Sequence, residues 1–185
     1  MTRIIAGTAG SLVLAVPDAG TRPTSDRVRE SLFGALEAAD LLTDAAVVDL
    51  YAGSGALGLE CVSRGAARAD LVERSPKAAA VTSRNARAVG RSTPDAEIRV
   101  HAQSADRFLR GATGSWDLAF LDPPYDLTDE ELTGTLTLLA PLLTEDATVI
   151  IERAARSPQP TLPTGLAHER HKRYGDTAVW WAVRS

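Results

Sequence analysis

The sequence holds one cysteine among its 185 residues, so no disulfide bond can form within the chain. It has no apolar run close to the ~20 residues that a transmembrane helix requires. The first 17 residues carry a single arginine and lack a clear hydrophobic region and cleavage site, which argues against a signal peptide. We therefore expect a cytoplasmic protein that makes no membrane contact.

Histidine is also scarce, with three residues in the chain. His168 and His171 are expected to point to opposite faces of one strand, and no cysteine or carboxylate completes a ligand set with them or with His101. Cys61 falls in a predicted helix and is more typical of a core residue than of a nucleophile. The sequence thus predicts no metal site.

Hydrophobic residues make up 44% of the chain and charged residues 24%, as in a globular protein with one core. The net charge of −4 is unevenly spread. Residues 1–30 hold four basic and three acidic side chains, residues 31–152 ten and nineteen, and residues 153–185 six and two, so the local balances are +1, −9 and +4. A polyanion would bind the two ends, if they come together in the fold. The alternative is a solvated charge pattern without a partner.

From residue 44 onward, five short β-rich runs alternate with helical stretches, as expected of a parallel sheet with helices on both faces. Two further extended runs are joined by Gly175-Asp176 and predict an antiparallel hairpin at the end. The expected strands are Ala46–Leu50, Ala69–Glu73, Glu97–His101, Leu118–Asp122, Ala147–Glu152, Ala167–Tyr174 and Ala178–Val183. The pattern therefore predicts an α/β fold with one seven-stranded, mostly parallel sheet.

The segment before this alternation has a different pattern. Two short extended runs, Arg3–Ala6 and Leu12–Val16, predict a small β-hairpin. A helix follows, with Thr24 or Ser25 as its N-cap. Its apolar stripe is formed by Val28, Leu32, Leu36 and Ala39. We expect residues 1–40 to form an appendage and residues 41–185 the main domain.

A glycine-rich turn follows the first strand of the main domain. Gly53, Gly55 and Gly58 have the G-x-G-x-x-G spacing at a strand-to-helix junction, where glycines let the backbone approach a ligand closely. Asp49 precedes them, and Glu73 ends the next strand, where a carboxylate can accept hydrogen bonds from ribose hydroxyls. A purely structural tight turn is the alternative to a ligand site.

Two ligand classes fit this turn. A dinucleotide would place its pyrophosphate at the helix N-terminus. S-adenosylmethionine has no phosphate, and its sulfonium and amino-acid groups suit a carboxylate at Asp49, which would repel a pyrophosphate. The chain is also short for a dehydrogenase with a separate substrate domain. The pattern favours S-adenosylmethionine.

A second motif, Asp122-Pro123-Pro124-Tyr125, ends the fourth strand of the main domain. The prolines remove two N–H donors, so the Asp122 carboxylate and the Pro123 carbonyl could both accept from one –NH2 group. Tyr125 offers a ring on which a planar base can stack. In a doubly wound sheet this turn and the glycine turn flank the switch point. A proline-rich strand exit without chemistry is the alternative.

Together these motifs resemble the class I S-adenosylmethionine-dependent amino-methyltransferases, with their Rossmann-like fold. Arg3-Ile-Ile-Ala-Gly7 and the block from Thr21 to Phe33 resemble more narrowly the RsmD family, bacterial 16S ribosomal RNA guanine-N2 methyltransferases. The resemblance covers nearly the whole chain, including the closing hairpin at Tyr174-Gly175.

The resemblance implies roles for particular residues. It implies a methionine-binding turn, a ribose carboxylate and an adenine border for the cofactor, and a clamp around a flipped-out base for catalysis. The basic residues at the two ends of the chain are expected to form one face that binds RNA. The cofactor residues are Asp49, Tyr51, Gly53, Gly55, Glu73, Arg74, Ser104, Ala105 and Asp122. The catalytic residues are Asp122, Pro123, Pro124 and Tyr125, and the RNA-binding residues are Arg3, Arg22, Arg27, Arg29, Lys172 and Arg173.

The sequence departs from the family pattern at three places. Leu12-Val13 replaces a basic pair in the hairpin, which weakens the expected phosphate contact there. Gly34 stands where Asn is frequent. Ser104 stands at the adenine position in place of Asp or Asn, with Asp106 two positions on.

We interpret the chain as a monomeric enzyme that methylates a guanine N2 amine of 16S ribosomal RNA within a small-subunit assembly. The same chemistry on adenine N6 or on a protein glutamine is the alternative. A non-catalytic nucleotide-binding module and a dinucleotide oxidoreductase are further alternatives.

Overall fold

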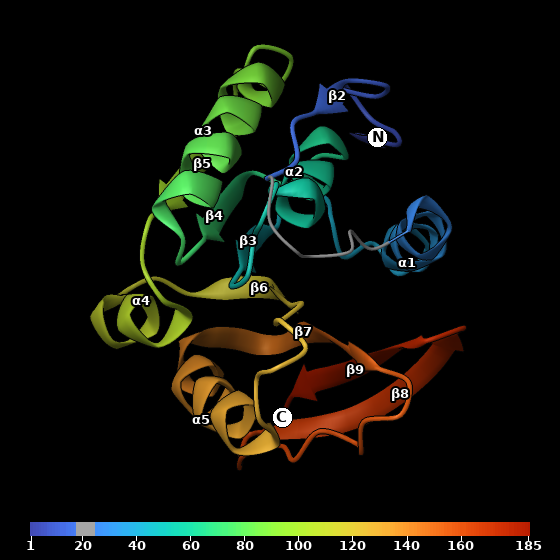
Figure 1. The fold of residues 1–185 in the computed structure, drawn as a ribbon, viewed down its shortest axis with the longest axis vertical. Coiled ribbons are helices and arrows are strands. Elements are labelled where there is room, and N and C mark those ends of the chain that lie inside the picture. Colours follow the sequence, from blue (N-terminus) through green and yellow to red (C-terminus); the bar gives the residue numbers. More distant parts are fainter. Residues whose placement is uncertain (18–24) are drawn as a thin grey trace.

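A computed structural model describes residues 1–17 and 25–185 of the protein (Figure 1). Its main sheet has seven strands in the order β5-β4-β3-β6-β7-β9-β8. The pairs from β5 to β7 are parallel, whereas β9 is antiparallel to both of its neighbours. The strands are β3 Ala46–Asp49, β4 Arg68–Val72, β5 Glu97–His101, β6 Trp116–Leu121, β7 Leu143–Ala154, β8 Leu166–Tyr174 and β9 Thr177–Arg184. The predicted fold class is confirmed.

Helices cover both faces of this sheet. One face packs against α4 and α5 through a core that includes Phe108, Leu132 and Leu136. The opposite face packs against α1, α2 and α3. The helices are α1 Asp26–Ala38, α2 Ala56–Ser63, α3 Pro76–Gly90, α4 Ala105–Gly111 and α5 Asp129–Leu139, followed by the short 3-10 helix η1 Ala140–Leu142. Within the described ranges, no helix has the length and apolarity needed to cross a membrane.

The first of these helices, α1, begins as the sequence predicts. The Ser25 hydroxyl accepts a hydrogen bond from the Val28 N–H at 3.3 Å and caps the N-terminus, while the other candidate cap, Thr24, lies outside the described residues. Val28, Leu32 and Leu36 are buried, as expected. Ala39 is not: the helix ends at Ala38, so the predicted apolar stripe is one residue too long.

The N-terminal hairpin of β1 (Thr2–Arg3) and β2 (Val13–Leu14) packs directly on α2. Ile4 and Leu14 belong to the same buried cluster as α2, β4 and α3. The buried Glu60 carboxylate accepts the backbone N–H groups of Ile5 at 2.7 Å and Ala6 at 3.0 Å. Residues 1–17 therefore share a core with the sheet.

The C-terminal hairpin, β8 and β9, carries an irregularity that the sequence did not reveal. The register shifts between His168 and Arg170. As a result both histidine rings contact Trp180, with the His171 ring stacked at 4.3 Å and the His168 ring edge-on at 5.8 Å. The prediction that these histidines point to opposite faces was wrong, because a β-bulge breaks the two-residue alternation.

Candidate active site

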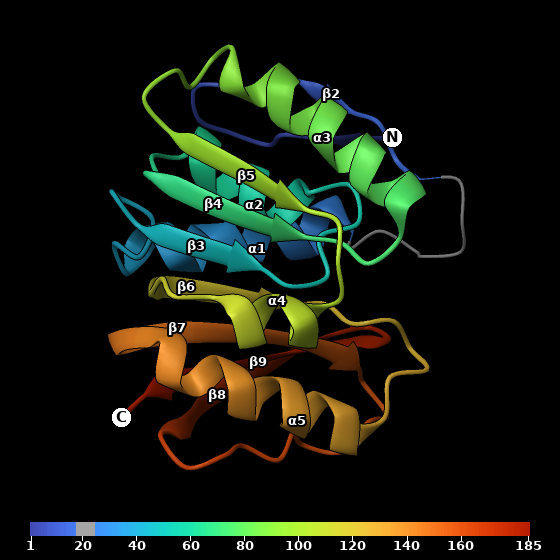
Figure 2. The ribbon, with the colours of Figure 1, turned by 90° about the vertical axis from the view of Figure 1, so that its left-hand side faces the viewer.

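The strand order reverses between β3 and β6, and the two predicted motifs leave the sheet at this point. The strands are parallel and paired, with Asp49 opposite Phe120. Figure 2 shows the parallel strands running in one direction, so their carboxyl ends lie along one edge. In open α/β sheets, ligands bind at this edge where the order reverses.

The glycine turn after β3 needs its glycines for two different reasons. Gly53 (φ +55°) and Gly55 (φ +82°) adopt left-handed backbone conformations that side chains disfavour. At Gly58 the reason is packing, because a Cβ would lie 2.3 Å from the Leu71 side chain. Nothing lies within 4 Å of a Cβ built on Gly53, so the turn is open to a ligand on that side.

Two side chains fix this turn, one from the residue that follows β4 and one from α3. The Gly53 N–H donates to Glu73 Oε2 at 3.0 Å, and the Thr82 hydroxyl donates to the Gly53 carbonyl at 2.6 Å. The Ser75 N–H donates to Glu73 Oε1 at 2.7 Å. Each carboxylate oxygen can accept more than one hydrogen bond, so the half-buried Glu73 can still bind ribose hydroxyls.

Asp49 lies beneath the turn and is 1% exposed. Its Oδ2 accepts the Gly58 N–H at 3.2 Å, and its Oδ1 is buried without a hydrogen-bond partner in the described part of the chain. Burial raises the pKa of Asp49 to about 7, and repulsion from Asp122 and Glu73 adds to this, while the hydrogen bond from Gly58 and the nearby N–H of Tyr51 lower it. A buried acceptor without a partner fits a cationic ligand group and would repel a phosphate.

The expected adenine border lies where β5 leads into α4. The Ser104 hydroxyl caps α4 by accepting the Arg107 N–H at 3.3 Å, and Ala105 is buried behind it. The alternative residue, Asp106, accepts a hydrogen bond from the Thr135 hydroxyl of α5 at 2.7 Å. Both candidates therefore have a structural partner already.

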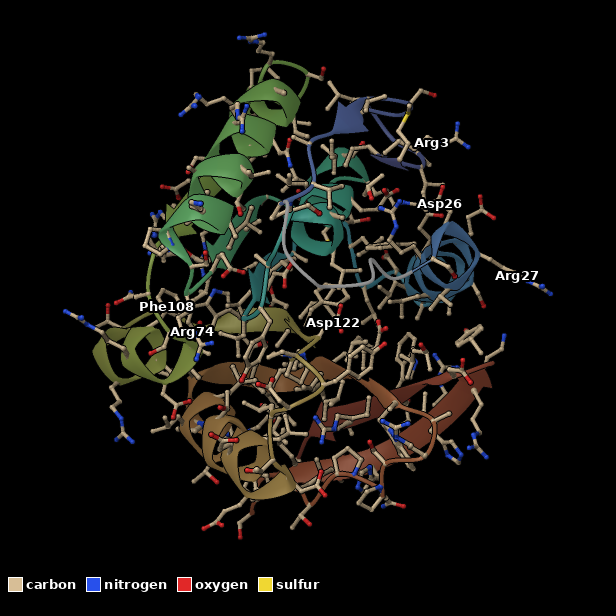
Figure 3. All side chains as sticks on the ribbon, in the orientation of Figure 1. Arg3, Asp26, Arg27, Arg74, Phe108 and Asp122 are labelled. Atoms are coloured by element: carbon tan, nitrogen blue, oxygen red, sulfur yellow. The ribbon has the colours of Figure 1, made fainter. Side chains whose placement is uncertain are left out.

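Tyr51 and Arg74 flank the turn in different ways. The Tyr51 hydroxyl lies 3.4 Å from the Thr135 hydroxyl, and burial raises the pKa of this tyrosine. Arg74 is exposed and lies beside α4 (Figure 3). Hydrogen bonds from Thr128 lower the pKa of Glu131, and the charge of Arg74 lowers it further.

The second motif follows β6 immediately. Asp122 is half-buried, and its charge helps to raise the pKa of Asp49. Pro123 is buried and Pro124 is exposed; the Pro124 carbonyl accepts the N–H of residue 127 at 3.0 Å and closes a turn. Tyr125 is 68% exposed, so its ring is available for stacking.

Arg153 of β7 fixes the far side of this turn and was missed from the sequence. Its Nη2 donates to the Leu127 carbonyl at 3.2 Å and to Asp129 Oδ1 at 2.8 Å. Thr82 of α3 was missed as well. The signal for Thr82 was a polar residue on the inward face of the helix that follows Glu73.

The predicted basic residues fall into separate groups. Arg3 and Arg27 are exposed and point outward in Figure 3, and Lys172 and Arg173 are exposed on the edge strand β8. Arg22 lies outside the described residues.

Arg29 is 1% exposed, so the prediction that it binds RNA was wrong. Its Nη2 donates to Asp26 Oδ1 and to the Arg3 carbonyl, both at 2.8 Å. Its Nη1 lies 4.0 Å from the buried Glu60 carboxylate. Arg29 therefore joins α1 to the hairpin and α2.

Known proteins resemble this chain both in sequence and in fold. The chain is 36% identical over 177 residues to ribosomal RNA small subunit methyltransferase D of Escherichia coli K12, an alignment that covers 95% of this chain and 86% of that protein. The solved structure of Escherichia coli yhhF has a TM-score of 0.84 at 34% identity and covers 99% and 97% of the two chains. A hypothetical protein of Thermus thermophilus has a TM-score of 0.82 at 30% identity, with 98% of each chain covered.

The family described as Conserved hypothetical protein 95 matches residues 2–183. This chain belongs to that family, which is the RsmD family that its motifs resemble.

Proposed function

We propose that this protein transfers a methyl group from S-adenosylmethionine to the N2 amine of a guanine in small-subunit ribosomal RNA. One observation carries the proposal: the buried, unpartnered carboxylate oxygen of Asp49 lies at the same switch point as the Asp122–Tyr125 turn. The first feature suits a cationic cofactor, and the second suits a planar amine. The substrate class comes from the Escherichia coli relative, whose name states small-subunit ribosomal RNA.

Different residues would bind different parts of the cofactor. Asp49 and the turn at Gly53 and Gly55 would hold the methionine part, and Glu73 the ribose. Ser104 or Asp106 would border the adenine. When bound, S-adenosylmethionine supplies an electrophilic methyl group. The protein would position the amine against this methyl group and stabilise the charge that develops in the transition state.

The target base would enter beside Asp122, flipped out of its stack. Asp122 and the Pro123 carbonyl would accept both hydrogens of the amine and orient its nitrogen lone pair toward the methyl group. The exposed ring of Tyr125 would stack on the base. Arg153 holds the peptide that follows, so the motif is fixed before the base arrives.

The RNA would bind the exposed basic residues of both ends of the chain: Arg3, Arg27, Lys172 and Arg173, with Arg22. Residues 1–40 would then serve as an RNA-binding unit on a methyltransferase domain of residues 41–185. Because Leu12-Val13 carries no charge, we expect weak binding to naked RNA and tighter binding to an assembled particle. A cytoplasmic monomer suffices for this reaction.

The test is transfer of a labelled methyl group to small-subunit particles that lack the modification, followed by nucleoside analysis. We expect label in N2-methylguanosine, with less transfer to protein-free RNA. Label in adenine or in a protein glutamine would support the alternative acceptors. Calorimetry that detects NAD but not S-adenosylhomocysteine would refute the cofactor assignment.

A further inference from the structure

Asn85 of α3 is a buried polar residue that the sequence analysis did not single out, and it is 4% exposed. Its Oδ1 accepts the Ala15 N–H at 2.9 Å. Its Nδ2 donates to the Ala15 carbonyl at 2.9 Å and to the Ser54 carbonyl at 2.8 Å. A single rigid amide thus bonds to two separate segments of backbone.

One of these segments belongs to the proposed cofactor site, and the other adjoins a proposed RNA contact. Ser54 lies between Gly53 and Gly55, in the turn that would hold the cofactor. Ala15 follows β2, whose Val13 pairs with Arg3 of β1, one of the proposed RNA contacts. Asn85 therefore links the cofactor turn to the N-terminal segment.

Other polar side chains of α2 and α3 bind either the cofactor turn or the N-terminal hairpin, but not both. Thr82, one turn earlier on α3, donates to the Gly53 carbonyl and to its own helix. Glu60 and Ser63 of α2 bind the hairpin between residues 5 and 9. These residues provide matched controls, because each fixes a segment without joining it to the other.

We propose that Asn85 is a positioning residue that couples cofactor binding to RNA binding. The two Nδ2 hydrogens point in fixed directions from a planar group, so a shift of the Ser54 carbonyl must be followed by Ala15 or must break a hydrogen bond. Ligand binding that orders the cofactor turn then also orders residues 12–17. By thermodynamic linkage, RNA bound at Arg3 of the same hairpin tightens the cofactor site by the same factor. This inference rests on the proposed function only where it names RNA.

The first test measures amide hydrogen exchange over residues 12–17 with and without S-adenosylhomocysteine, and it needs no RNA. In the wild type we expect the cofactor product to slow exchange in this segment by about fivefold. Asn85→Asp keeps the acceptor for the Ala15 N–H but loses both donors, so the slowing should disappear. Thr82→Val should weaken binding of S-adenosylhomocysteine and still show the slowing at saturation. Equal slowing in wild type and Asn85→Asp would overturn the proposal.

A second variant weakens the link from the other side. Ala15→Pro removes the N–H that donates to Asn85 Oδ1 but leaves both Nδ2 bonds, to the Ala15 and Ser54 carbonyls, in place. It should therefore reduce the slowing over residues 12–17 without abolishing it. Thermal melting establishes that both variants are folded before exchange is compared, so loss of coupling is separated from loss of structure.

The last test measures the dissociation constant of S-adenosylhomocysteine with and without saturating unmodified small-subunit particles. We expect a ratio of about 5–10 in the wild type and in Thr82→Val, about 1 in Asn85→Asp, and a value between these in Ala15→Pro. A ratio of 1 in the wild type, or an unchanged ratio in Asn85→Asp, would show that Asn85 is only structural. If particles do not bind the wild type at all, the proposed function fails instead, and the exchange result still decides the role of Asn85.

Discussion

The hydroxyl groups of Ser31 and Tyr174 share a hydrogen bond of 2.8 Å, although the two residues are 143 positions apart. Lys172 Nζ also donates to Ser31 Oγ, at 3.1 Å. The helix α1 and the edge strand β8 are thereby joined, and apolar residues of α1 pack against Trp181 beneath them. One helix of the N-terminal part and one strand of the C-terminal part of the chain thus lie side by side, an arrangement that a shared polyanion surface would need.

Tyr174→Phe removes one partner of that bond without removing the ring. We expect the free energy of unfolding to fall by about 0.5–1.5 kcal/mol, the usual net contribution of such a hydrogen bond. Urea unfolding measures the change. Tyr125→Phe is the control, because Tyr125 is 68% exposed and should leave stability unaltered. Equal stability of the wild type and Tyr174→Phe would mean that water replaces the bond at no cost.

Arg27 and Arg29 are two positions apart on α1, but substitution of Arg27 should affect RNA binding and substitution of Arg29 should affect stability. Arg27→Ala removes an exposed charge, so it should weaken RNA binding, lower the salt slope by about 1 and leave stability unchanged. Arg29→Ala removes the buried hydrogen bonds to the Arg3 carbonyl and to Asp26, while Glu60 keeps Arg64 at 2.7 Å, so we expect a loss of about 1.5–3 kcal/mol of stability. Filter binding over a salt series and urea unfolding separate the two effects. A stable Arg29→Ala protein that had lost RNA binding would restore Arg29 as a phosphate contact.

Arg29 also shows what the sequence could and could not reveal. Strand alternation and the two turn motifs were sufficient for the sheet, its closing hairpin and the switch point. Positive charge alone did not distinguish Arg27 from Arg29, because burial depends on which residue of another helix lies opposite. Glu60 was the available signal: a carboxylate within the otherwise apolar run of α2 needs a buried cation or backbone donors.

Two further features depended on long-range geometry. The bulge in β8 that brings His168 and His171 onto Trp180 changes the register by one residue and leaves no pattern in the local sequence. The role of Asn85 depends on Ala15, which is 70 positions away, and on a turn that only the folded chain places beside it. Sequence periodicity carries neither kind of information.

The raised pKa of Asp49 makes cofactor binding depend on pH. With a pKa of about 7 against an ordinary value of 3.8, the carboxyl group is largely protonated at pH 6 and largely ionised at pH 8. Only the ionised form attracts a cation, so the affinity for S-adenosylmethionine should rise between pH 6 and pH 8 by up to about tenfold per pH unit below the pKa, and then level. Calorimetry at several pH values measures this.

Asp49→Asn is the control for this dependence. It should bind S-adenosylmethionine weakly and with a flat profile across the same range. The folded protein holds the proton that the unfolded chain releases between pH 4 and pH 7, so without cofactor the wild type should lose stability over that interval relative to Asp49→Asn. A wild-type binding profile as flat as that of the variant would place the ionisation elsewhere.

The clamp formed by Asp122 and Tyr125 gives the most direct test of the mechanism. If Asp122 holds the amine more tightly as its nitrogen becomes nucleophilic, Asp122→Ala should depress single-turnover methyl transfer far more than it weakens cofactor binding. Asp122→Asn keeps an acceptor oxygen and should retain part of the activity. Tyr125→Phe keeps the stacking ring and should be mild, whereas Tyr125→Ala should be severe. The expected order is wild type, Tyr125→Phe, Asp122→Asn, and then the two alanine variants. Near-normal turnover by Asp122→Ala would show that the turn only ends the strand, and the proposed amine methylation at this site would be refuted.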